Sequence, residues 1–103
     1  MHSNNAQMLV LTVLADGPLH GYAINTAIES LAGSKLGPGS LYGALSRLET
    51  HGLIRPADEA NDPGQRHRTM QITDAGRNLL RTELQQMARV SSAGLHALGV
   101  DPA

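Results

Sequence analysis

Five histidines are the first candidates for chemistry, because histidine binds metals and transfers protons near neutral pH. No two of them are three or four residues apart, as ligands on one helix face would be. The chain also lacks cysteine, so it has no thiolate to complete a zinc site and forms no disulfide. We therefore expect no metal and no cofactor at these positions, which are His2, His20, His51, His67 and His96.

A glycine-rich stretch around Ser40 is the second candidate. Residues 37–43 read GPGSLYG, which superficially resembles a nucleophile elbow or a phosphate-binding loop. The stretch has the glycine spacing of neither motif, and it does not follow a predicted strand. No pair of Asp and Glu is placed for acid–base catalysis either. We therefore expect that the chain is not an enzyme.

Arginines give the clearest indication of function, because they bind phosphates and guanine bases. The net charge is only −1, but residues 63–81 carry four arginines against one acid. Two of them, Arg66 and Arg68, follow a strong turn signal at residues 61–64 in a run without acids. This local positive charge is compatible with nucleic-acid binding, although the net charge of the whole chain does not indicate it.

Helices and one hairpin are predicted to position these residues. With no Phe or Trp and two Tyr, the composition favours helices around an aliphatic core. Caps, periodicity and turn signals predict a helix or a buried strand over 7–15, helices over 19–32, 38–51 and 74–98, and strands over 53–57 and 67–73. The last helix opens at Thr73, whose hydroxyl is expected to cap it.

This order of elements is that of a winged helix-turn-helix. The expected fold is mainly α with a small β-hairpin, divided into a DNA-binding part over residues 1–73 and a C-terminal dimerisation helix over 74–103, in one compact unit. In such folds the third helix lies in the major groove and the hairpin reaches neighbouring phosphates. The helix faces and the arginine run predict the following DNA contacts: Ser40, Gly43, Ser46, Arg47, Arg66 and Arg68.

The last helix also predicts a homodimer. Positions 80, 84, 87, 91, 94 and 98 alternate in steps of four and three, as in helices that pair along a seam. Residues 8–14 are apolar on nearly every side, which suits a helix between two surfaces. The dimer interface is expected to contain Leu9, Val13, Leu80, Leu84, Met87, Leu95 and Leu98.

Three further expectations concern single residues and location. Tyr22 is expected in the core, and His20 as a local cap or core partner. Because Phe and Trp are absent, no stacking pocket for a planar aromatic effector is expected, and the sequence identifies no other effector. The longest apolar run is too short to span a membrane, so we expect a cytoplasmic protein without membrane contact.

Several segments resemble the PadR family of bacterial transcriptional regulators. They are LADGPLHGY at residues 14–22, LGPGSLYGALSRLE at 36–49, GLI at 52–54 and ITDAGR at 72–77. The resemblance covers about residues 8–90. It implies a winged-helix repressor that forms a two-fold dimer, with Ser40, Tyr42 and Arg47 at the DNA. The sequence departs from the family at Gly43, where proline is frequent, and at Thr69-Met70, where two aromatic residues are common.

Two functions remain open from the sequence. The first is a dimeric repressor that recognises an inverted-repeat operator, with half-site centres about 34 Å apart. The alternative is a winged-helix dimerisation module that binds protein rather than DNA. The net charge of −1 and the acids at the predicted hairpin tip, Asp58, Glu59 and Asp62, motivate this alternative.

Overall fold

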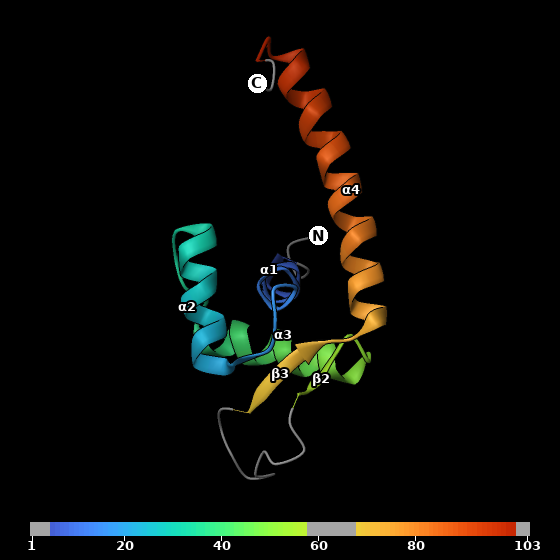
Figure 1. Cartoon of the computed structure of the whole chain (residues 1–103). Coiled ribbons are helices and arrows are strands. Elements are labelled where there is room, and N and C mark those ends of the chain that lie inside the picture. Colours follow the sequence, from blue (N-terminus) through green and yellow to red (C-terminus); the bar gives the residue numbers. More distant parts are fainter. Residues whose placement is uncertain (1–4, 58–67, 101–103) are drawn as a thin grey trace.

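The first apolar segment forms the central helix of the domain. In the computed structural model, which describes residues 5–57 and 68–100, α1 spans Asn5–Leu14 and contacts α2, α3, α4 and β3 (Figure 1). Its residues Val10, Leu11, Val13 and Leu14 are buried. The neighbouring Met8 and Leu9 are partly buried against the same core. This segment is therefore a helix and not a strand. Most of its apolar side chains pack into the core of the same chain.

The second predicted helix begins two residues later than expected. Leu19–His20 forms a short strand, β1, and α2 spans Gly21–Ala32. The His20 side chain caps this helix, because its Nδ1 accepts a hydrogen bond from the Ala23 backbone N–H at 3.4 Å. The helix ends at Gly33, whose φ of +89° lies in the left-handed region that glycine adopts without strain. The capping role expected of His20 is confirmed.

The expected two-stranded hairpin is part of a three-stranded antiparallel sheet. Strand β2 spans Ile54–Pro56, β3 spans Thr69–Ile72, and the order is β1-β3-β2. The prediction of two strands was incomplete because β1 is only two residues long and pairs with a strand fifty residues away, Leu19 opposite Met70. As expected from the alternation, Met70 and Ile72 point into the core.

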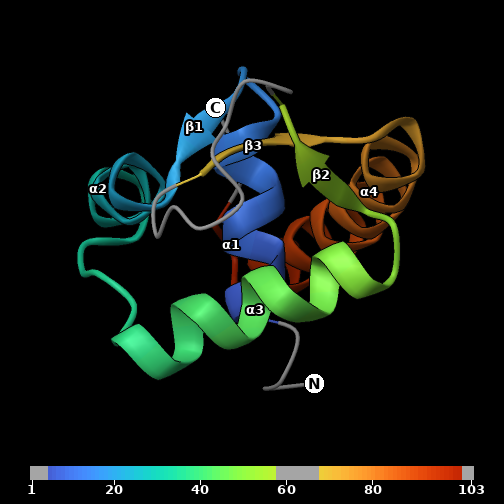
Figure 2. The same ribbon diagram turned by 90° about the horizontal axis from the view of Figure 1, so that it is seen from below.

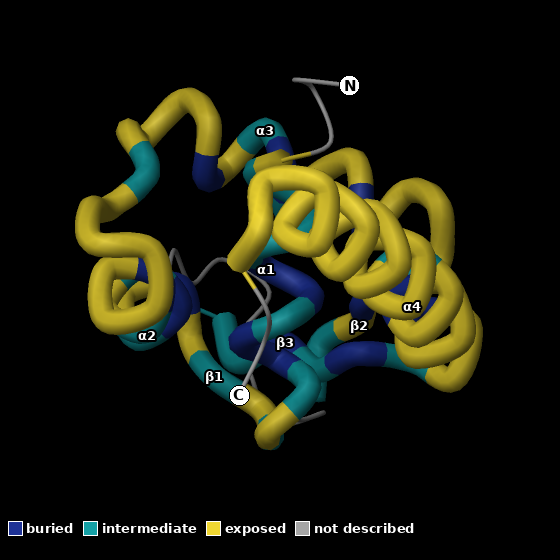
Figure 3. The backbone as a smooth tube through the Cα atoms, turned by 90° about the horizontal axis from the view of Figure 1, so that it is seen from above, coloured by how far each residue is buried: buried dark blue, intermediate teal, exposed yellow. Residues whose placement is uncertain are grey.

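The last helix packs on the domain only near its beginning. Helix α3 spans Pro38–Thr50, and α4 spans Asp74–Ala97. The Thr73 hydroxyl caps α4 by accepting from the Gly76 backbone N–H at 3.1 Å, which confirms the predicted cap. Gly76 and Leu80 are the buried residues of α4, and every residue from 84 to 100 is exposed (Figure 3). Helix α4 therefore extends well beyond the body of the domain (Figure 1).

The predicted fold class is confirmed: the described residues form a mainly helical domain with a small sheet at one end. The buried core consists of Val, Leu, Ile, Ala and Met, with no aromatic side chain among the described residues. None of the helices within residues 5–57 and 68–100 is long and apolar enough to cross a membrane.

Candidate nucleic-acid interface

Helix α3 has one buried face and one open face. Leu41, Ala44 and Leu48 recur at helical spacing and are buried in the core. Pro38 at the first turn, preceded by Gly37 as cap, fixes where the helix begins. Seen from below, α3 lies across the domain, and β2 is the strand next to it (Figure 2). The residues of its open side are exposed or, for Gly43, half-buried: Gly39, Ser40, Gly43, Ser46, Arg47 and Thr50.

The predicted contact residues of α3 share this open side. Ser40, Ser46 and Arg47 are exposed. The Arg47 side chain runs back along the helix, because a Cβ placed on Gly43 would lie 3.8 Å from the Arg47 guanidinium. The Arg47 side chain therefore lies over Gly43, which agrees with the half-buried state of Gly43, while Ser40 and Ser46 stay exposed on the same side of the helix.

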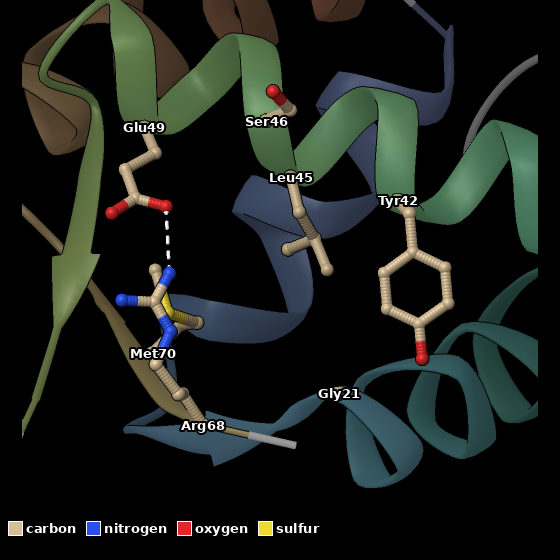
Figure 4. Close-up of a pocket in the computed structure, with 7 residues that line it drawn as sticks. All are labelled: Gly21, Tyr42, Leu45, Ser46, Glu49, Arg68 and Met70. Carbon is tan, nitrogen blue, oxygen red and sulfur yellow. Dashed lines mark hydrogen bonds and ion pairs between the residues drawn. The ribbon is translucent and has the colours of Figure 1, made fainter. Parts of the chain in front are cut away.

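Tyr42 leaves α3 on its other edge. Its side chain is 44% exposed and extends toward the beginning of α2, near Gly21 (Figure 4). Between α3, α2 and β3 lies a pocket of about 290 Å³. Its lining combines apolar and charged side chains: Gly21, Tyr42, Leu45, Ser46, Glu49, Arg68 and Met70.

An ion pair joins this pocket's two sides. The Arg68 guanidinium donates to the Glu49 carboxylate at 3.0 Å, with the two side chains 34% and 38% exposed. The pair connects the residue before β3 to the last turn of α3 (Figure 4). Arg68, predicted as a DNA contact, therefore lies beside α3 with its charge partly balanced. The other predicted arginine of this segment, Arg66, lies outside the described residues, as do the acids of the predicted hairpin tip.

Sequence reasoning missed a second arginine on the sheet. Arg55 of β2 is exposed and is in register with Gln71 of β3. With the Gln71 amide oriented to satisfy both groups, its oxygen accepts from Arg55 Nε at 3.0 Å and Nη2 at 2.9 Å. The sequence did contain a signal for this position. Alternation along β3 turns Gln71 away from the buried Met70 and Ile72, so the residue paired with it, Arg55, faces outward as well.

Tyr22 is not a core residue, and the prediction that placed it there was wrong. Its side chain is 66% exposed, and the Lys35 ammonium lies 5.6 Å from the centre of its ring. The buried side of α2 carries Ile24 and Ile28. Tyr22, at the beginning of the helix, does not lie on that side. Sequence reasoning assigned Lys35 no role.

The residues predicted at a dimer interface divide into two groups. Val13 and Leu80 are 8% and 5% exposed and belong to the protomer's own core, so they have little surface left for a partner. Leu9 is half-buried against that core. By contrast, exposed apolar side chains continue along α4, beside a shallow pocket of about 410 Å³. They are Leu84, Met87, Val90, Leu95 and Leu98, the last of which follows the helix.

Comparison with curated proteins finds a similar sequence. Over 91 residues the chain is 59% identical to an uncharacterised 37.1 kDa protein in transposon TN4556 of Streptomyces fradiae. The match covers 88% of this chain but 25% of that protein, so the chain spans about a quarter of its relative's length.

Solved structures share the fold. A PadR family transcription regulator from Clostridium difficile aligns with a TM-score of 0.75 at 22% identity, over 90% of this chain and 97% of that one. A PadR-like transcriptional regulator from Bacillus cereus aligns with a TM-score of 0.75 at 24% identity, over 89% of each chain. The sequence model of the transcriptional regulator PadR-like family matches residues 10–82, more than half of the chain, and the chain belongs to that family.

Proposed function

We propose that this chain binds double-stranded DNA as a homodimer and represses transcription from an inverted-repeat operator. The observation that carries the proposal is the open side of α3, where small residues surround an exposed arginine. A helix with small outward residues can approach the floor of the major groove, and an arginine at its edge reaches a phosphate or a guanine. Family membership supports the same assignment to transcriptional regulation.

The proposed contacts from α3 are Ser40, Tyr42, Gly43, Ser46 and Arg47. Arg68 joins them from the β3 side, where its guanidinium lies 3.0 Å from the Glu49 carboxylate of α3. Arg66 is included on the sequence pattern alone. Because α3 contacts β2 of the sheet (Figure 2), one duplex can meet both, with α3 in the groove and the sheet end at the adjacent phosphates.

The exposed half of α4 supports the proposed dimer. An isolated helix of this length is marginally stable in water, and here its apolar side chains are left uncovered. Pairing with a second copy through Leu84, Met87, Leu95 and Leu98 would bury that face. A two-fold dimer presents two α3 helices, so the operator would have half-sites about 34 Å, or ten base pairs, apart. We place this activity in the cytoplasm, without membrane contact.

The test is selection from a pool of randomised duplexes, followed by titration of the selected site at several salt concentrations. We expect a palindromic site and a steep linear fall of log affinity with log salt. R47A should reduce that slope by about 0.9 per protomer if Arg47 binds a phosphate. If Arg47 instead reads a guanine, R47A should cost about 1–3 kcal/mol at that base pair and relax specificity there.

Arg89 supplies the matched control. It is exposed on the distal half of α4, so R89A removes the same charge away from α3. We expect R89A to leave both the selected site and the salt slope unchanged. Failure to enrich any site, with weak binding that disappears at physiological salt, would contradict the proposal and favour a module that binds protein.

A further inference from the structure

Two side chains near the beginning of α3, Lys35 and Tyr22, are not among the contacts proposed above. Lys35, in the connector between α2 and α3, lies over the ring of Tyr22. Tyr42 lines the same small pocket, of about 150 Å³, as these two residues. The pocket is therefore a polar and aromatic notch beside the first turn of α3.

The backbone next to Lys35 is fixed by Asn25 of α2. The Asn25 amide nitrogen donates to the Leu36 carbonyl at 2.9 Å, and its oxygen accepts from the Leu36 N–H at 2.9 Å. These two hydrogen bonds use both ends of the amide and hold the connector against α2. Lys35 is the residue immediately before this clamp, so the base of its side chain has a defined position.

The charge of Lys35 is available to a ligand. Among the described residues it makes no ion pair, and neither α2 nor α3 carries an acid in its first turn. Contact with the Tyr22 ring orients the ammonium but satisfies none of its N–H donors with an oxygen. An exposed, oriented ammonium with free donors is suited to an anionic oxygen, such as that of a phosphate.

The spacing along α3 matches the dimensions of the major groove. Pro38 is nine residues before Arg47, a distance of about 14 Å along a helix axis. The major groove is about 12 Å wide. For a helix that lies across the groove with its middle at the floor, the beginning of the helix and its connector therefore reach the phosphates at the groove's edge.

We propose that Lys35 binds a backbone phosphate of the DNA duplex at the edge of the major groove, and that the ring of Tyr22 is its positioning residue. The assignment rests on the proposed function of DNA binding and adds a contact to it. Because a phosphate contact carries no base information, Lys35 contributes affinity to every sequence alike.

The experiment is a salt titration of the full chain on the selected duplex and on an unrelated duplex. K35A should lower the salt slope by about 0.9 per bound protomer on both duplexes, and K35R should restore it. Y22L should weaken binding about twofold to fivefold by removing the ring, and Y22F should restore it because the ring remains. Thermal unfolding of K35A should match that of the unaltered chain, because Lys35 is exposed.

The outcomes separate this inference from the proposed function. A K35A slope equal to that of the unaltered chain, while R47A still weakens binding, would overturn the Lys35 contact alone. A loss in K35A that K35R does not restore would also overturn it, since the effect would not depend on charge. Unaltered affinity in Y22L would overturn the positioning role of Tyr22. Absence of salt-dependent DNA binding by the unaltered chain would overturn both proposals.

Discussion

Substitution of Gly76 by alanine should destabilise the domain more than the same substitution at the other helical glycines Gly39, Gly43 and Gly94. Gly76 lies in the first turn of α4, just after β3, where the helix backbone comes close to Leu53 and Ile72. An added Cβ would overlap the Leu53 carbonyl oxygen and lie 2.8 Å from Ile72 Cγ1. Neither neighbour can easily withdraw: Leu53 is held by hydrogen bonds to Leu48 and Thr73, and Ile72 is buried in the core.

The magnitude follows from two opposing contributions. Alanine gains up to about 1 kcal/mol of helix propensity over glycine. Overpacking costs about 1–3 kcal/mol, and displacing the Leu53 carbonyl also weakens its bond from Thr73, worth about 1 kcal/mol. We expect a net loss of about 2 kcal/mol, which lowers the melting temperature of a domain of this size by about 8–16 °C.

The assay is thermal unfolding followed by circular dichroism, with G43A as the matched control. Gly43 is also helical, but the nearest atom to an added Cβ is the flexible end of Arg47, at 3.8 Å. G43A should therefore raise the melting temperature through helix propensity, opposite in sign to G76A. If G76A melted at or above the unaltered chain, the close approach of α4 to Leu53 would not be a constraint and this reasoning would be refuted.

Three further predictions concern the cap of α4, the ion pair and the dimer. T73A removes the acceptor for the Gly76 N–H and the donor to the Gly52 carbonyl, so urea unfolding should show a loss of about 1–2 kcal/mol, largely recovered in T73S. E49Q removes an acid beside Arg68 and should tighten binding to unrelated DNA and steepen its salt slope; weaker binding would instead mean that Glu49 positions Arg68. M87E places a charge on the exposed apolar side of α4 and should shift the mass measured by light scattering from dimer to monomer, whereas an unchanged dimer mass would count against that interface.

Elements with local signals were predictable from the sequence. Pro38 after Gly37 and the hydroxyl of Thr73 mark where α3 and α4 begin, and both helices begin there. Such capping signals depend only on residues that are close together in the sequence. Strand β1 has no such signal, because two residues show no alternation and their pairing with β3 is decided by the packed domain. Tyr22 was misplaced for a related reason: position along the helix stripe, rather than its aromatic character, decides its exposure.

The sequence predicts which side of each helix or strand of the candidate site is exposed, but it does not predict which side chains form ion pairs. Helical spacing separates the open side of α3 from its buried side, and alternation places Arg68 on the same strand face as Met70 and Ile72. That face looks onto the helices, so an arginine at its end must meet one of them. A half-buried guanidinium without a partner is costly, which makes an acid on the facing helix the favourable arrangement. Glu49 is that acid, yet only the three-dimensional packing decides which turn of α3 lies opposite Arg68, nineteen residues away in sequence.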